Sequence, residues 1–239
     1  MDRREPPWDR PGEPHRMEAP VNPLPPVIAA LALLIAGVEL VLTLAGRGLI
    51  GGPGAVGWRL EAMQRFGVFG SVLDQMAARR LFPPEELIRL LTYAFVHGGF
   101  VHALFAVVFL LAMGKFAGEV FAGWKLAVLF FASSVFGALV WWLATDDPAP
   151  LIGAYPGAYG LIGAFTFILW AGLSLRGERR AQAFRLIAFL VGFQVLFFGL
   201  FGGTLGFVAE IAGFAAGFAL SFVLAPGGWT ALRDRLRSR

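Results

Sequence analysis

Six long runs of apolar residues, separated by short polar or glycine-rich segments, dominate the chain. Each run is apolar around the whole helical circumference rather than along one stripe, which is typical of membrane-spanning helices. At about 1.5 Å per residue, each is long enough to cross most or all of the apolar layer of a bilayer. The spans are expected at residues 27–45, 90–113, 125–144, 152–173, 184–200 and 205–224.

The segment 46–88 between the first two runs has a different pattern. Apolar residues recur there at three- and four-residue steps with arginine and glutamine between them, which predicts amphipathic helices lying in the membrane interface. Pro84 followed by Glu85 and Glu86 indicates the start of a further helix, since proline and acidic residues favour the first turn.

The composition supports a membrane protein. Of the 239 residues, 57% are hydrophobic and only 15% are charged, too few to cover a soluble domain of this size. The formal net charge of +4 does not indicate a nucleic-acid partner, because the basic residues are placed like topology signals. There is no cysteine, which excludes disulfides and thiolate chemistry but leaves the redox compartment open.

The distribution of lysine and arginine predicts the orientation. Lys115 and Lys125 border the loop between the second and third spans, and four arginines follow the fourth span. The short loops after the third and fifth spans contain neither residue type. Because short cytoplasmic loops are enriched in basic residues, we expect both termini to be cytoplasmic in an inner (plasma) membrane protein.

Three regions follow from these patterns. Residues 1–26 contain eight prolines and are expected to form a disordered cytoplasmic tail. Residues 27–225 form the six-span membrane domain, whose first run is expected to be a retained span and not a cleaved signal peptide. Residues 226–239 form a basic cytoplasmic tail that includes the last four arginines.

A motif at the second span gives the first functional indication. Residues 89–105 read Arg-Leu-Leu-Thr-Tyr-Ala-Phe-Val-His-Gly-Gly-Phe-Val-His-Ala-Leu-Phe. This stretch resembles the entry to the second span of rhomboid intramembrane serine proteases, with Arg89, His97 and His102 at matching positions. Ile88 replaces a tryptophan, and Ala106 stands where the family has an asparagine. The resemblance covers spans two to six and implies the all-α, six-helix rhomboid fold.

The resemblance also defines where catalytic residues are expected. Rhomboids use a serine at the start of span four and a histidine on span six as a nucleophile–base dyad. Here Gly153 is followed two residues later by Tyr155 in the serine position, and Glu210 takes the histidine position. Shifting the alignment of span four places another tyrosine, Tyr159, at the serine, although Tyr159 is better explained as the packed aromatic residue found there in the family.

The frame around these positions is retained. Gly213 and Gly217 follow Glu210 at the spacing that the resemblance requires and that lets membrane helices approach closely. No family catalytic residue is therefore intact: Tyr155, Glu210 and Ala106 replace the serine, the histidine and the oxyanion-binding asparagine. We expect a catalytically degenerate, pseudoprotease-like member.

The unusual polar residues have structural and functional interpretations. Tyr155 is expected to fill the space at the start of span four, with its hydroxyl bonded to a polar neighbour. Glu210 is expected to pair with His102 or a tyrosine, with a proton-linked or ligand-binding role as the alternative. Glu39 in the first span should face other helices or an interface. The five-residue spacing of His97 and His102 does not favour a metal, and no cofactor is expected.

Three functions remain open from the sequence. The first is non-catalytic binding and regulation of single-span transmembrane client proteins, through the gap between spans two and five that admits substrates in the family. The second is a rewired or residual intramembrane serine endopeptidase-like activity that uses Tyr155, Glu210 and His102. The third is a proton-linked or small-ligand role at Glu39 and Glu210. Partners other than the lipid bilayer and such clients, including nucleic acid, are not expected; the sequence decides neither the client nor the oligomeric state.

Overall fold

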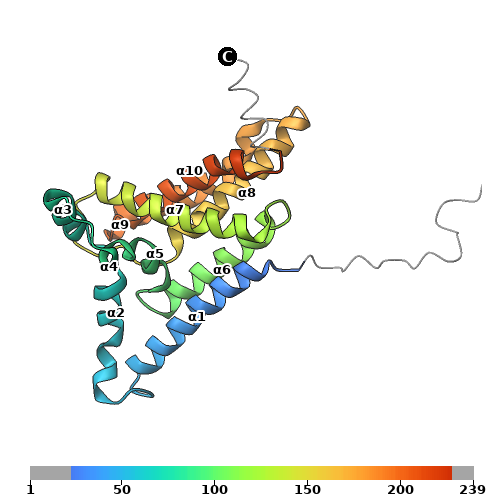
Figure 1. The fold of residues 1–239 in the computed structure, drawn as a ribbon. Helices are drawn as coiled ribbons and strands as arrows, with labels where there is room; N and C mark the ends of the chain where they lie inside the picture. The colour runs from blue at the N-terminus through green and yellow to red at the C-terminus, as the bar shows by residue number, and fades with distance from the viewer. Residues whose placement is uncertain (1–22, 228–239) are drawn as a thin grey trace, which may run out of the picture.

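The computed structural model describes residues 23–227, and this part of the chain folds into a helical bundle (Figure 1). Six of its helices are long and apolar enough to cross a membrane, which confirms the all-α, six-span architecture. They are α1 (Pro26–Gly46), α6 (Phe100–Ala117), α7 (Gly123–Ala144), α8 (Tyr155–Leu175), α9 (Arg185–Phe201) and α10 (Gly206–Leu224). The span of α9 includes the preceding 3₁₀ turn and runs over Arg180–Phe201. Most of the two expected tails lies outside the described residues.

The segment between α1 and α6 contains several short helices, as its amphipathic pattern predicts. They are the 3₁₀ helix η1 (Pro53–Gly57), α2 (Trp58–Phe66), α3 (Gly70–Arg79), α4 (Pro84–Leu87), α5 (Arg89–Thr92) and the 3₁₀ helix η2 (Tyr93–Phe95). The helix expected at the Pro-Glu-Glu sequence is α4, with Glu85 and Glu86 in its first turn. The Trp142 indole of α7 donates a 2.8 Å hydrogen bond to Asp74, which fixes α3 beside that helix.

The second span begins ten residues later than the sequence predicts. Residues 90–99 do not continue a straight helix: η2 ends at Phe95, Val96 is extended, and α6 begins only at Phe100. Gly98 and Gly99 explain this difference, because two consecutive glycines have low helix propensity and leave the main chain free to turn. The turn buries Tyr93, whose hydroxyl donates to the Ser134 carbonyl at 2.8 Å.

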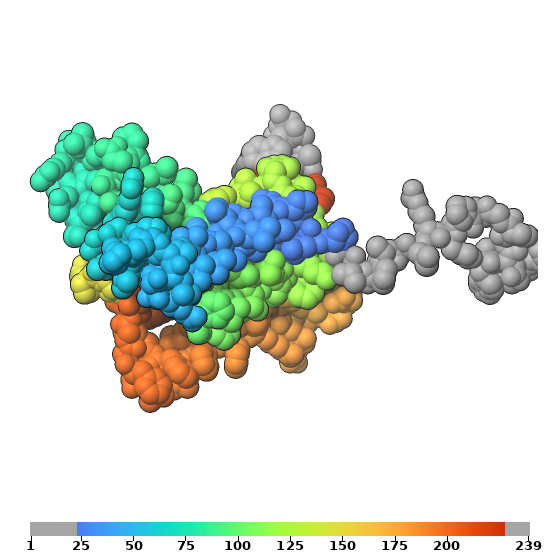
Figure 2. Space-filling view, turned by 90° about the horizontal axis from the view of Figure 1, so that it is seen from below, coloured from blue at the N-terminus to red at the C-terminus, as the bar shows by residue number. Residues whose placement is uncertain are grey.

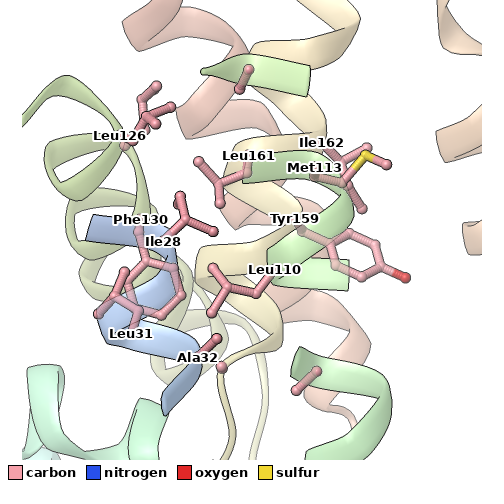
Figure 3. Close-up of a cluster of buried hydrophobic side chains, with 14 of the residues drawn as sticks. Ile28, Leu31, Ala32, Leu110, Met113, Leu126, Phe130, Tyr159, Leu161 and Ile162 are labelled. Carbon is pink, nitrogen blue, oxygen red and sulfur yellow. The ribbon is translucent and has the colours of Figure 1, made fainter. Parts of the chain in front are cut away.

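The core of the bundle lies between α1, α6, α7 and α8. Figure 3 shows this cluster, to which α1 contributes Ile28, Leu31 and Ala32, and α6 contributes Leu110 and Met113. Leu126 and Phe130 from α7 and Tyr159, Leu161 and Ile162 from α8 complete the labelled set. Helix α8 is half buried along its length, which makes it the central helix of the fold.

Helices α8 and α10 pack with almost no side chains between their backbones. A Cβ atom at Gly213 would collide with the main chain of Pro156, and one at Gly217 would collide with the main chain of Gly160. The close approach expected for this glycine pair is therefore present, and it fixes α10 against the start of α8.

Helix α9 is the exception to this close packing. Ile187 is its only buried residue, and the helix contacts mainly α10 and the preceding 3₁₀ helix η3 (Arg180–Phe184). Phe189, Phe193, Phe197 and Phe201 form a ladder of neighbouring rings along one exposed face. In Figure 2, α9 (orange) lies at the lower edge of the molecule, on the other side of α6 (green) from α1 (blue).

Candidate functional site

The residues just before α8 contact the rings of His97 and His102. Gly153, just before the helix, has φ = +98°, a conformation that favours glycine, and a Cβ there would lie 3.0 Å from the His102 ring. The next residue, Ala154, donates its N–H to His97 Nε2 at 3.2 Å. The Gly98 N–H donates to His102 Nδ1 at 3.2 Å, and the two imidazoles meet edge to face at 5.2 Å. His97, His102 and Gly153 are thus brought together, as the motif implies.

Burial determines the protonation of His97. The residue is only 1% exposed, and this burial, assisted by the nearby His102, lowers the pKa of His97 to about 4. At neutral pH the ring is uncharged, so its Nε2 can accept the Ala154 N–H. The role of His97 in this structure is to hold the first residues of the α8 turn.

Tyr155 occupies the first position of α8 and packs on His102. The two rings are stacked with centroids 5.0 Å apart and planes 14° from parallel. The Tyr155 hydroxyl donates to the main-chain carbonyl of His102 at 3.1 Å. Tyr155 therefore has the polar partner expected of it, and its hydroxyl oxygen contacts no side-chain base.

Ala106 lies one turn beyond His102 on α6 and is completely buried. Its methyl group has no hydrogen-bonding capacity, so this position offers no donor to the start of α8. The site consequently has no side-chain donor at the position corresponding to the family's asparagine.

Of the two kinds of partner expected for Glu210, His102 or a tyrosine, the structure places a tyrosine beside it and forms no hydrogen bond to His102. The Glu210 carboxylate accepts a hydrogen bond from Gln194 on α9, and the Tyr159 hydroxyl of α8 lies near it. The sequence predicts a tyrosine as one of the two partners expected for Glu210, but it does not predict Gln194 as the hydrogen-bond donor. One sequence feature does indicate Gln194: it is the single uncharged polar residue within the apolar sequence of α9, where a polar side chain needs a partner on another helix.

A second polar network links the first span to the site. Arg59 of α2 forms an ion pair with Glu39 at 2.7 Å and also donates to the His97 carbonyl at 2.7 Å. Thr43 donates to Glu39 at 2.7 Å, so the carboxylate is fully enclosed and 4% exposed. Glu39 therefore faces protein, as expected, whereas its partner Arg59 was not predicted from the sequence.

Arg89 anchors the segment between α1 and α6. It donates to the carbonyls of Gln64 at 2.6 Å and Gly67 at 3.2 Å, and its Nε lies 2.5 Å from a Glu86 carboxylate oxygen. Val68 and Leu151 next to this anchor exchange two main-chain hydrogen bonds of 3.1 and 2.8 Å. The segment is thereby joined directly to the loop that precedes α8.

Two adjacent cavities meet at Glu210. The first has a volume of about 270 Å³ and lies between Met63, the loop 147–152, and the starts of α8 and α10, with His102, Tyr155 and Trp141 in its wall. The second, of about 320 Å³, lies between α9 and α10 and is lined by Phe193, Gln194 and Phe197. The cavities share Thr204, Gly206 and Glu210.

The chemistry of these walls is limited. No serine, lysine or arginine is among the residues that line either cavity. Ser133, Ser134 and Ser221 are completely buried elsewhere between helices. Within residues 23–227, no group of three or more histidine, aspartate or glutamate side chains forms a candidate metal site. The polar lining consists of carboxylates, hydroxyls, one imidazole, one amide and one indole.

Comparison with protein families gives a single assignment. The family model of the rhomboid domain matches residues 84–227, which is more than half of the chain and includes every element of the site except α1 and α2. A search of curated proteins found no match.

Proposed function

This chain belongs to the rhomboid family, and from that premise we propose that it is a pseudoprotease that binds and regulates single-span transmembrane client proteins. The proposal places it in an inner (plasma) membrane with both termini in the cytoplasm, as the basic loops indicate. The observation that carries it is the side chain at the head of α8, where a tyrosine stacked on His102 replaces a nucleophile.

A serine hydrolase needs a nucleophile in contact with a base that accepts its proton. Neither cavity contains a serine, and the Tyr155 hydroxyl is bonded to a main-chain carbonyl rather than to a base. Glu210, on the helix that carries the family base, is turned toward Gln194 and Tyr159. Loss of the nucleophile or the base alone removes most of the catalysis in such enzymes, and here both positions have changed.

The scaffold that surrounds the site supports a binding function. The tight α8–α10 contact, the Gly153 turn and the Arg89 anchor are all in place. Helix α6 packs mainly against α1 and α8, while α9 packs mainly against η3 and α10, so the side of the bundle between α6 and α9 is not closed by direct packing. An apolar client helix can lie along this side without displacing a tightly packed helix.

The test is a cleavage and capture assay in membranes against a panel of model single-span proteins. It compares the native chain with an empty-membrane control and with a variant in which four residues are restored to the family pattern. The four changes are Tyr155→Ser, Glu210→His, Ala106→Asn and Pro156→Gly, the last because the family motif has a glycine directly after the serine. We expect no cleavage by the native chain, together with crosslinking of at least one span.

Cleavage by the restored variant would demonstrate that the six-helix scaffold can still position a serine and a histidine for catalysis. Cleavage by the native chain above the empty control would overturn the proposal and direct attention to Tyr155 as a nucleophile. A native chain that neither cleaves nor crosslinks any span would refute client binding.

A further inference from the structure

We propose that the two cavities that meet at Glu210 select clients by charge, and that the preferred client carries a lysine or arginine near one end of its membrane span. This inference rests on the proposed client-binding function and specifies its ligand. The recognised group is the ammonium or guanidinium of that side chain, together with a main-chain carbonyl close to it.

The first argument is the charge of the shared wall. Glu210 and Asp147 both line the first cavity, and no lysine or arginine lines either cavity. Asp147 is already occupied, since it accepts the N–H groups of Ala149 at 3.0 Å and Leu205 at 2.6 Å. Among the described residues no ion pair involves Glu210, so its carboxylate lies within the membrane domain without a cationic partner. A carboxylate in such surroundings favours a cation.

The second argument comes from two polar atoms that have no hydrogen-bond partner. Trp141 is 1% exposed and lines the first cavity, and its indole N–H donates to no acceptor in the described chain. Gln194 lines the second cavity and uses its amide N–H on Glu210, which leaves its buried Oε1 without a donor. Buried polar atoms without partners are uncommon and are often completed by a ligand or water.

These two atoms restrict the ligand further. Gln194 Oε1 requires a donor, whereas the Trp141 N–H requires an acceptor, and the Glu210 carboxylate, which already accepts from Gln194, still lacks a cation. A bare cation satisfies the carboxylate and the amide but cannot accept from the indole. A basic side chain on a polypeptide supplies N–H donors, and the main chain next to it supplies a carbonyl. Such a carbonyl is free only in the last turn of the client helix, at its C-terminus, because the other carbonyls are bonded within the helix.

The position of Glu210 sets where the charge must lie. Glu210 is four residues into α10, or about 6 Å from the helix start, at the end of the bundle formed by the loops 145–154 and 202–205. The second cavity reaches it from the side of α9, with Phe193 and Phe197 in the cavity wall. Long basic side chains pack their methylene stems on apolar surface and can place the charge against aromatic rings. A client span beside α9 can thus extend a lysine one turn from its end toward Glu210.

The test uses photo-crosslinking in native membranes. A photoreactive amino acid replaces Phe193, and the chain is combined with a series of single-span proteins of identical leucine–alanine sequence. The series differs only at one position, one turn from the end nearest Glu210, which is lysine, glutamine, glutamate or leucine. The protein variants are Glu210→Gln, Glu210→Asp and Glu210→Lys. Glu178→Gln serves as the control, since Glu178 is an exposed carboxylate outside both cavities, paired with Arg176 at 3.0 Å.

We expect the lysine span to crosslink at least about tenfold more than the leucine or glutamine span, because a charge pair in low-dielectric surroundings outweighs a neutral contact. Glu210→Gln should remove this preference while leucine-span capture continues, and Glu210→Asp and Glu178→Gln should retain it. Glu210→Lys should transfer the preference to the glutamate span, a reversal that misfolding cannot produce.

The photoreactive chain that retains Glu210 can overturn the inference without any further variant. Equal capture of all four spans would mean that clients bind but that charge does not select them. Equal capture of the lysine and glutamine spans would assign the preference to hydrogen bonding instead of charge and would also refute it. Absence of crosslinking to every span would refute the client-binding function itself, and the inference with it.

Discussion

The Tyr155 ring lies parallel to the His102 imidazole at 5.0 Å, and its hydroxyl is bonded to the carbonyl of the same histidine. One side chain thus fixes both the ring and the main chain of its neighbour on α6. This arrangement joins α8 to α6 at the start of α8.

The first prediction tests the contact between Tyr155 and His102. Tyr155→Phe keeps the stacked ring and removes one hydrogen bond, so we expect a loss of about 1 kcal/mol in the free energy of unfolding. Tyr155→Ala also removes the ring and enlarges the first cavity, and should cost about 3 kcal/mol. Thermal unfolding in detergent micelles measures both. Equal effects of the two substitutions would show that the ring contributes nothing to packing.

The second prediction concerns the Glu39–Arg59 ion pair. Because Glu39 is buried, Arg59→Met leaves a buried carboxylate without its cation and should cost roughly 3 kcal/mol. Glu39→Gln should cost less, because the Arg59 side chain is 23% exposed and water can solvate its charge. The double variant, Glu39→Gln with Arg59→Met, should be more stable than the sum of the two single effects implies. A double-mutant cycle of unfolding free energies makes the comparison, and strict additivity would contradict a direct interaction.

The third prediction concerns the contact of α8 with α10. A Cβ at position 217 meets the main chain of Gly160, so Gly217→Ala must push the two helices apart and should cost roughly 2 kcal/mol. Gly192→Ala on α9 is the matched control, because a Cβ there has nothing within 4 Å. It should not destabilise the protein, and the higher helix propensity of alanine should add up to about 1 kcal/mol. Similar melting temperatures for the two variants would exclude the tight packing described.

The fourth prediction concerns pH. The pKa of His97 is lowered in the folded protein to about 4 from a reference of 6.5. Between these values the unfolded chain binds a proton that the folded chain does not, so stability must fall as the pH decreases from 6.5 to 4 and change little further below 4 through this group. The full loss corresponds to about 3 kcal/mol.

His97→Gln provides the comparison for the pH prediction. Glutamine does not titrate, yet its oxygen can accept the Ala154 N–H that His97 accepts at present. Unfolding of the native and variant chains is followed across this pH range, with His102, Glu39 and Glu210 titrating in both. The variant should have the smaller slope between pH 4 and 6.5. Identical slopes would show that His97 is protonated equally in the folded and unfolded chains.

The six spans could be predicted from the sequence because hydrophobic runs of this length, in a protein with so few charged residues, form few structures other than membrane-spanning helices. The start of α6 could not be placed from hydrophobicity, since residues 90–96 are as apolar as a span and only Gly98 and Gly99 indicate the turn. Likewise, the glycine pair Gly213 and Gly217 indicated a close helix contact without identifying α8 as the partner.

The polar contacts of the site were harder to foresee. Glu39 and Glu210 were recognisable as unusual residues within apolar runs, but their partners lie on separate elements, Arg59 on α2 and Gln194 on α9. Periodicity gives the face of a helix and not the neighbour that this face meets. For this reason the sequence could not decide between His102 and a tyrosine as the partner of Glu210; in the structure, His102 stacks on Tyr155 instead.

The loose packing of α9 also has a consequence for how this protein can change over time. Only Ile187 is buried in that helix, and Gln194 is its one polar link to α10. Most other positions need only remain apolar, so substitutions there carry little folding penalty. Mutation can therefore alter the shape of α9, the helix beside which we propose that clients bind, while the remaining five spans keep their structure. A new binding preference could arise in this lineage without a compensating change in the core.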